Sequence, residues 1–209
     1  MAQRGGGGRR RRQRRQQVQY EELDKYPVAP PHAFARIVRD LRTLNIVYQV
    51  IEPPLTKKEE EVRSEIESIF VQALTADIDE MDANPELYLR AAMDQIIKSY
   101  RLKVNKKSRS KIFYYLKRDL IGYGRMDVLM NDANVEDVSL DGTNIPIFAY
   151  HRKFESTETT IAWPTDQELE SYVIKLAQRC GKHISVAEPL LDATLMDGSR
   201  IVMKLGREV

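Results

Sequence analysis

Cysteine is almost absent from this sequence, because Cys180 is the only one among 209 residues. A single thiol excludes an intramolecular disulfide framework and fits a reducing compartment, so we expect a cytoplasmic location. It also has no partner for a Cys-x-x-Cys motif, and His32, His151 and His183 stand too far apart for a metal-ligand spacing. No metal site is predicted, and His183 is expected to be a satisfied or surface histidine after a helix end.

Long apolar runs are also missing. No stretch approaches the roughly 20 apolar residues that a membrane helix needs. The basic N-terminus is not followed by the apolar segment of a signal peptide. We therefore expect a soluble chain, whose link to a membrane would go through a partner or through its arginine-rich tail.

A phosphate-binding loop of the form G-x-x-x-x-G-K-S/T is absent. The single Gly-Lys pair, Gly181-Lys182, has Leu176 where the first glycine should stand and His183 where the hydroxyl should follow. A G-x-S-x-G nucleophile motif is absent as well. The sequence thus predicts no catalytic residue and no cofactor for this chain alone.

The positive charge is concentrated at the N-terminus. Seven arginines lie within residues 4–15, where no acidic residue occurs, and the rest of the chain has 26 of the 33 Lys and Arg residues against 31 Asp and Glu. Residues 1–19 combine this charge with a run of four glycines, a composition that predicts disorder. Two interpretations stay open for this tail: an arm for nucleic acid or anionic lipid, or a solvated terminus.

Residues 20–121 are predicted to form a small, mostly helical N-terminal domain. Two short strands or extended arms are expected at 34–38 and 46–50, where β-branched and aromatic residues gather. Three helices should follow. The first begins at a Thr56/Glu59 capping box and runs to about Leu74, the second runs from Asn84-Pro85 to about Leu102, and the third follows a polar break at 105–110 and ends at Gly122.

In residues 122–209 the pattern changes from helical spacing to a mixture of strands and one helix. This order predicts an α+β domain with an antiparallel sheet. The expected elements are a hairpin at 135–140 and 145–150, a strand at 157–163, a helix from Thr165 to Gly181, and a hairpin at 190–195 and 199–205.

Four motifs in this second part resemble the type II/IV secretion ATPase family. They cover 122–132 (GYGRMDVLMND), 135–142 (VEDVSLDG), 176–185 (LAQRCGKHIS) and 189–201 (PLLDATLMDGSRI). The upstream part is more loosely similar to archaeal members, through residues 20–31, the strand end at 48–53 and the helices after Leu55-Thr56. The order and spacing of all four motifs make the resemblance more specific than any one of them.

The resemblance implies a PAS-like domain that precedes a RecA-like, P-loop ATPase domain, with 208–209 at the start of the linker. The chain would be the non-catalytic N-terminal part of a homo-hexamer that binds ATP and Mg²⁺ on the missing domain. It would lie at the cytoplasmic face of the membrane against a polytopic platform protein and drive pilus, archaellum or pseudopilus assembly. The alternative is a stand-alone adaptor or regulator that binds nucleic acid or anionic surfaces through its tail.

The resemblance also implies that arginines of this part reach the ATP held by the catalytic domain. Arg200 is the first candidate for such a nucleotide-sensing arginine and Arg179 the second. Asp192, Asp197 and Gly198 would support them. A competing interpretation is that Arg200 pairs with Asp192 or Asp197 across the hairpin. Two positions depart from the family pattern: Thr194 stands where some members have arginine, and Met196 where proline is usual.

Overall fold

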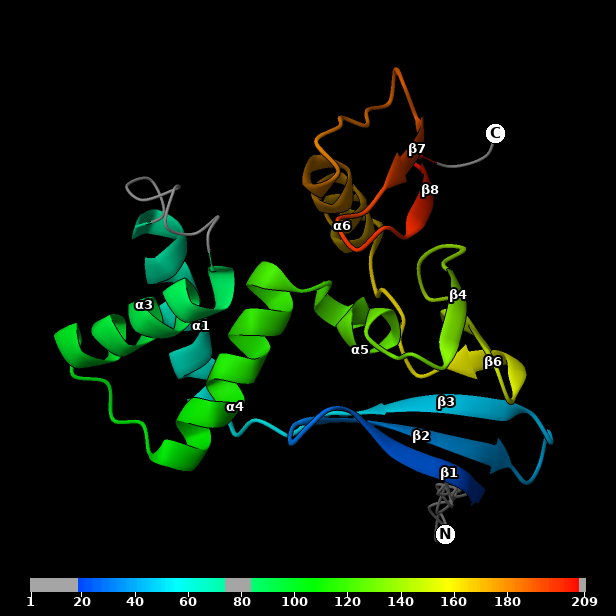
Figure 1. The fold of residues 1–209 in the computed structure, drawn as a ribbon, viewed down its shortest axis with the longest axis horizontal. Coiled ribbons are helices and arrows are strands. Elements are labelled where there is room, and N and C mark those ends of the chain that lie inside the picture. Colours follow the sequence, from blue (N-terminus) through cyan, green and yellow to red (C-terminus); the bar gives the residue numbers. More distant parts are fainter. Residues whose placement is uncertain (1–18, 74–83, 207–209) are drawn as a thin grey trace, which may run out of the picture.

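The computed structural model describes residues 19–73 and 84–206 and confirms an α+β fold. Figure 1 shows a large sheet, a group of helices beside it, and a third group in which α6 packs with a two-stranded sheet. The expectation of disorder for the basic tail falls on residues 1–18, outside the described residues. The predicted C-terminal end of the first helix, at Leu74, also lies outside them.

The large sheet has six strands in the order β1-β2-β3-β6-β5-β4. Their bounds are β1 Tyr20–Ala29, β2 Ala33–Asp40, β3 Ile46–Ile51, β4 Val135–Ser139, β5 Phe148–His151 and β6 Glu155–Thr159.

The expectation of an antiparallel sheet is wrong at one place, because β3 and β6 pair in parallel through Val47↔Glu158 and Tyr48↔Thr159. The other neighbouring strands are antiparallel, so the sheet is mixed. This pairing also places strands from both sides of the boundary expected near 122–124 in one sheet. The cause is a shared apolar core, in which Ile37 and Tyr48 are buried together with Ile147 and Trp163.

The chain enters this sheet beside the turn that joins β2 to β3. The carbonyl of Gln19 accepts a hydrogen bond of 3.0 Å from the Leu41 amide. Leu41 and Leu44 in that turn are exposed. Gln19, the first described residue, therefore lies at the end of the sheet where the β2–β3 turn is located.

A buried polar cluster ties the loop after α5 (Asp127–Met130) to the sheet. One carboxylate oxygen of Asp132, Oδ2, accepts hydrogen bonds of 2.6 Å from the Tyr26 and Tyr48 hydroxyls. The Tyr26 oxygen lies 3.0 Å from Nε2 of His151. Three strands thereby share one fully occupied hydrogen-bond network.

The helical group consists of α1 (Lys57–Ala73), α3 (Pro85–Ser99) and α4 (Lys106–Leu116). Both predicted N-terminal signals are confirmed. Thr56 and Glu59 form the reciprocal bonds of a capping box, and the Asn84 side chain accepts from the Leu87 amide. The three helices bury one core, which includes Ile66, Phe70, Leu89, Met93, Ile112 and Leu116. None of the helices in residues 19–73 and 84–206 is long and apolar enough to cross a membrane.

The polar break expected at 105–110 is wrong, since α4 already begins at Lys106. Asn105 caps it by accepting a bond of 2.9 Å from the Ser108 amide. The helix continues as the π-helix η1 (Lys117–Ile121) and ends at Gly122, as predicted. A short helix η2 (Gly124–Met126) then leads into α5.

The C-terminal group follows the predicted elements. Thr165 caps α6 (Asp166–Arg179), and Gly181 ends it with a left-handed φ of 66°. The predicted hairpin is β7 (Leu190–Thr194) paired with β8 (Arg200–Lys204). The strand expected to run to 163 stops at Thr159, because Trp163 instead forms an isolated bridge with Thr143 and is buried in the core.

Candidate functional site

Three of the four motifs that carry the family resemblance pack into one apolar core. It is formed by Val173, Leu176, Ala177, Ile184, Leu195 and Met203, with Tyr123 and Met130 against it. The remaining motif supplies β4 of the large sheet. Segments far apart in the sequence therefore form one continuous unit around α6.

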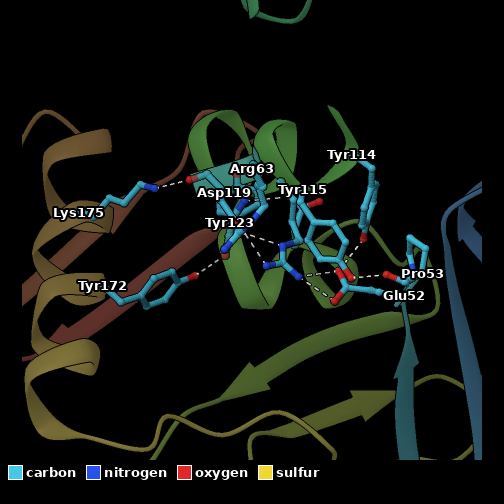
Figure 2. A network of polar contacts seen from close by, with 12 residues as sticks. Glu52, Pro53, Arg63, Tyr114, Tyr115, Asp119, Tyr123, Tyr172 and Lys175 are labelled. Atoms are coloured by element: carbon cyan, nitrogen blue, oxygen red, sulfur yellow. Dashed lines mark hydrogen bonds and ion pairs between the residues drawn. The ribbon is translucent and has the colours of Figure 1, made fainter. Parts of the chain in front are cut away.

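Two cations of α6 bind the end of the α4–η1 helix. Lys175 donates a hydrogen bond of 2.5 Å to the Asp119 carbonyl, and Arg179 donates to the carbonyls of Ile121 and Gly122. Figure 2 shows Lys175 reaching Asp119 from α6. These carbonyls carry the negative end of the helix dipole and lack partners within the helix. Lys175 and Arg179 thus join the C-terminal group to the helical group.

Arg118 is the centre of a second set of contacts, on the sheet side of the same joint. It donates to both carboxylate oxygens of Glu52, at 2.8 and 2.7 Å, and to Asp119 at 2.8 Å. Arg63 donates to the other oxygen of Asp119 at 2.8 Å. The Arg118 guanidinium lies 4.6 Å from the ring centre of Tyr115 and its side chain is 13% exposed. The end of β3, α1 and η1 are therefore held by paired and largely desolvated charges.

A cleft of about 610 Å³ opens between α1, η1 and α6. Its lining carries five Arg or Lys side chains and three Asp or Glu side chains. They are Arg63, Arg118, Arg125, Lys175 and Arg179, and Glu67, Asp119 and Glu168. The cleft is therefore more basic than residues 16–209 as a whole, which have 26 Lys and Arg residues against 31 Asp and Glu.

The two candidate nucleotide-sensing arginines do not meet. Arg179 lines the cleft, whereas Arg200 lies on β8 with its side chain 74% exposed. Arg200 makes a bidentate pair with Asp192, at 2.5 and 3.1 Å, which is one of the pairings considered from the sequence. This pair lowers the pKa of the Asp192 carboxyl. The guanidinium is held in place yet remains open to solvent.

The supporting residues of the hairpin shape its turn. Gly198 has a φ of 89°, which glycine adopts without a steric penalty. Asp197 accepts a bond of 2.9 Å from the Ser199 amide and one of 3.2 Å from the Tyr123 hydroxyl. Asp197 thus connects the hairpin tip to the first motif.

Sequence reasoning did not single out the other four cations of the cleft, which are Arg63, Arg118, Arg125 and Lys175. One signal was available, because Lys175 and Arg179 stand four residues apart and so share a helix face. Arg63 and Arg118 come from separate helices and carry no local signal. No group of three or more potential metal ligands gathers in residues 19–73 and 84–206, and His183 is exposed.

The fold and this joint define an α+β protein with a basic cleft and an exposed arginine hairpin. No protein-family model matches the sequence. The chain is similar to three proteins of the archaeon Methanocaldococcus jannaschii. The uncharacterized protein MJ1288 is 40% identical over 78% of this chain, MJ0900 is 38% identical over 48%, and MJ0781 is 37% identical over 43%. The matched part spans 65%, 18% and 12% of the length of these relatives, respectively.

Proposed function

We propose that this chain is the non-catalytic N-terminal part of a hexameric secretion or pilus-assembly ATPase. In this role it couples ATP binding and hydrolysis on a RecA-like domain to protein export or filament assembly at the cytoplasmic face of the membrane. The α+β unit from residue 122 onward would be the PAS-like domain of that family.

The observation that carries the proposal is the exposed Arg200 on a hairpin whose core also contains two of the other three motifs. An arginine that acts on a neighbouring domain's γ-phosphate must project from its own domain and must be supported from behind. Arg200 meets both requirements, because its side chain is 74% exposed and Asp192 holds it in a bidentate pair. Exchange of Asp192 for a phosphate would preserve the same fork geometry.

The joint at the cleft supports the coupling role. Lys175 and Arg179 connect α6 to the end of η1 through polar contacts, and the apolar residues of these two elements belong to different core clusters. Polar joints allow packed groups to shift as rigid bodies more readily than interdigitated cores do. A movement of the hairpin toward nucleotide would thus be passed to the helical group.

The test has a genetic and a biochemical part. The reading frame that encodes this chain should continue into a G-x-x-x-x-G-K-S/T sequence within roughly 100 residues of Val209. In the resulting full-length protein, Arg200→Ala should lower ATP turnover at least about tenfold, a conservative figure for an arginine that stabilises phosphoryl transfer.

Arg152→Ala is the matched control. Arg152 is also exposed and also paired with a carboxylate, Glu136, at 3.0 Å, but it lies in the turn between β5 and β6 of the large sheet. Its replacement should leave turnover unchanged. A reading frame without the phosphate loop, or an Arg200→Ala protein with full activity, would contradict the proposal.

A further inference from the structure

We infer that the cleft between α1, η1 and α6 is a binding site for a small phosphorylated ligand. This site belongs to the chain itself and does not rest on the proposed function, since every residue that forms it lies between Arg63 and Arg179. It is also separate from Arg200, which does not line the cleft.

The two cations on the α6 wall carry charge that no carboxylate in the described part of the chain neutralises by a direct ion pair. Lys175 and Arg179 donate to backbone carbonyls instead. On the opposite wall, Arg63 and Arg118 have carboxylate partners in Asp119 and Glu52. A dianionic ligand would therefore find its counter-charge on α6.

The proximity of these cations favours an anion between them. Lys175 and Arg179 lie one helical turn apart and contact neighbouring carbonyls of the same helix end. Partial desolvation and then the charge of Arg179 lower the pKa of Lys175. Bound phosphate would reverse this repulsion, because each phosphate oxygen accepts charge-assisted hydrogen bonds from both side chains.

The second observation concerns the Nε atom of Arg63, on the wall of the cleft that faces α6. It is buried and has no hydrogen-bond partner among the residues described. Such unsatisfied donors are rare in folded proteins and point to a missing acceptor. A small shift of the Arg63 side chain toward the cleft would offer this donor to a ligand oxygen.

The size and lining of the cleft define the class of ligand. A volume of about 610 Å³ falls within the range of small-molecule pockets, roughly 300–1,000 Å³. Its uncharged lining includes the polar side chains of Gln167 and Ser171 on α6. Two or more phosphates, as in pyrophosphate or a nucleoside diphosphate, would fill the basic part.

The test measures binding to this chain by isothermal titration calorimetry and by the shift of its melting midpoint. The probes are inorganic phosphate, pyrophosphate and ADP, each without metal ions. We expect pyrophosphate and ADP to bind more tightly than phosphate, and binding to weaken as salt is raised. Equal affinity for pyrophosphate and ADP would show that the cleft recognises the phosphates alone. Tighter binding of ADP would show that the cleft also contacts the nucleoside.

Two substitutions should act in opposite directions. Lys175→Gln removes a ligand donor and should weaken binding about tenfold, which corresponds to about 1.4 kcal/mol. Glu67→Gln removes a negative charge from the lining and should strengthen binding. Lys175→Arg should restore most of the affinity, and Lys98→Gln, at a residue of α3 that does not line the cleft, is the control for a change of net charge alone.

Two results would contradict the proposed ligand site. Absence of binding by all three probes at millimolar concentration would overturn the site. So would equal affinity of the Lys175→Gln and Glu67→Gln proteins. Neither result would bear on the proposed function, which concerns Arg200 and a separate ATPase domain.

Discussion

At the level of single residues, the fold depends most on buried polar groups that are satisfied by one hydrogen bond, and the Tyr48 hydroxyl is such a group. Tyr48 is fully buried and donates its hydroxyl to Asp132 at 2.6 Å. Burial raises the pKa of Tyr48 and the Asp132 carboxylate raises it further, so the hydroxyl stays protonated as a donor. Removal of the Tyr48 hydroxyl oxygen should therefore lower the stability of the fold.

We predict that Tyr48→Phe lowers the free energy of unfolding by about 1–3 kcal/mol, because Asp132 then loses a donor in a buried environment. Urea titration followed by circular dichroism measures this change. Tyr150→Phe is the control, since Tyr150 is 46% exposed and its change should stay within about 0.5 kcal/mol. Similar losses for the two variants would contradict the role of the Asp132 cluster.

The helices begin at capping residues, and some of these caps are easier to recognise in the sequence than others. Thr56 with Glu59, Asn84 with Pro85, and Thr165 with Glu168 combine a capping residue with a second cue, and all three helix starts were predictable. Asn105 stands before two lysines and has no such second cue, so the helix itself was predicted but its start was placed too late. Its side chain nonetheless makes the bond that starts α4.

We therefore predict that Asn105→Ala lowers the free energy of unfolding by about 1 kcal/mol, the usual loss for an N-cap. The core residues Ile112 and Leu116 lie on this helix, so the loss should appear in the global unfolding transition. Asn105→Asp keeps a capping carboxylate and should stay close to the original protein. A loss for Asp as large as for Ala would argue against capping.

At the scale of the whole molecule, long-range pairings were beyond what the sequence could predict. β3 and β6 meet through residues about 110 positions apart, and neither strand carries a sign of its partner. The cleft has the same origin, since Arg63, Arg118 and Arg179 come from three elements that only tertiary packing brings together. By contrast, the β7–β8 hairpin and α6 follow from turn and capping residues alone and were predicted correctly.

The stability of the whole molecule should fall in mild acid because of His151. This residue is 2% exposed, and its Nδ1 accepts from the amides of Lys153 at 3.1 Å and Phe154 at 3.3 Å. Protonation would place a third donor against these two. Burial lowers the pKa of His151 below 6.5, although the charges of Asp132 and Asp24 oppose this and Lys153 adds to it.

The sign of the effect follows from proton binding. The unfolded chain takes up a proton near pH 6.5 and the folded chain only at lower pH, so stability is constant above about 6.5 and declines as pH falls toward the folded-state pKa. Urea titrations at several pH values between 7.5 and 5 should show this decline. His151→Gln should be less stable at neutral pH but show a flatter dependence in that range, and an unchanged slope would contradict the assignment.

The hydrogen bond between Gln19 and Leu41 has a practical consequence for handling the protein. It fixes the position of Gln19 beside the β2–β3 turn, while the β7–β8 hairpin lies on the other side of the molecule (Figure 1). A surface anchor attached at residue 19 itself would therefore hold the molecule by this end of the sheet and leave Arg200 of the hairpin facing the solution. Biosensor chips loaded in this way would present the hairpin to every incoming partner.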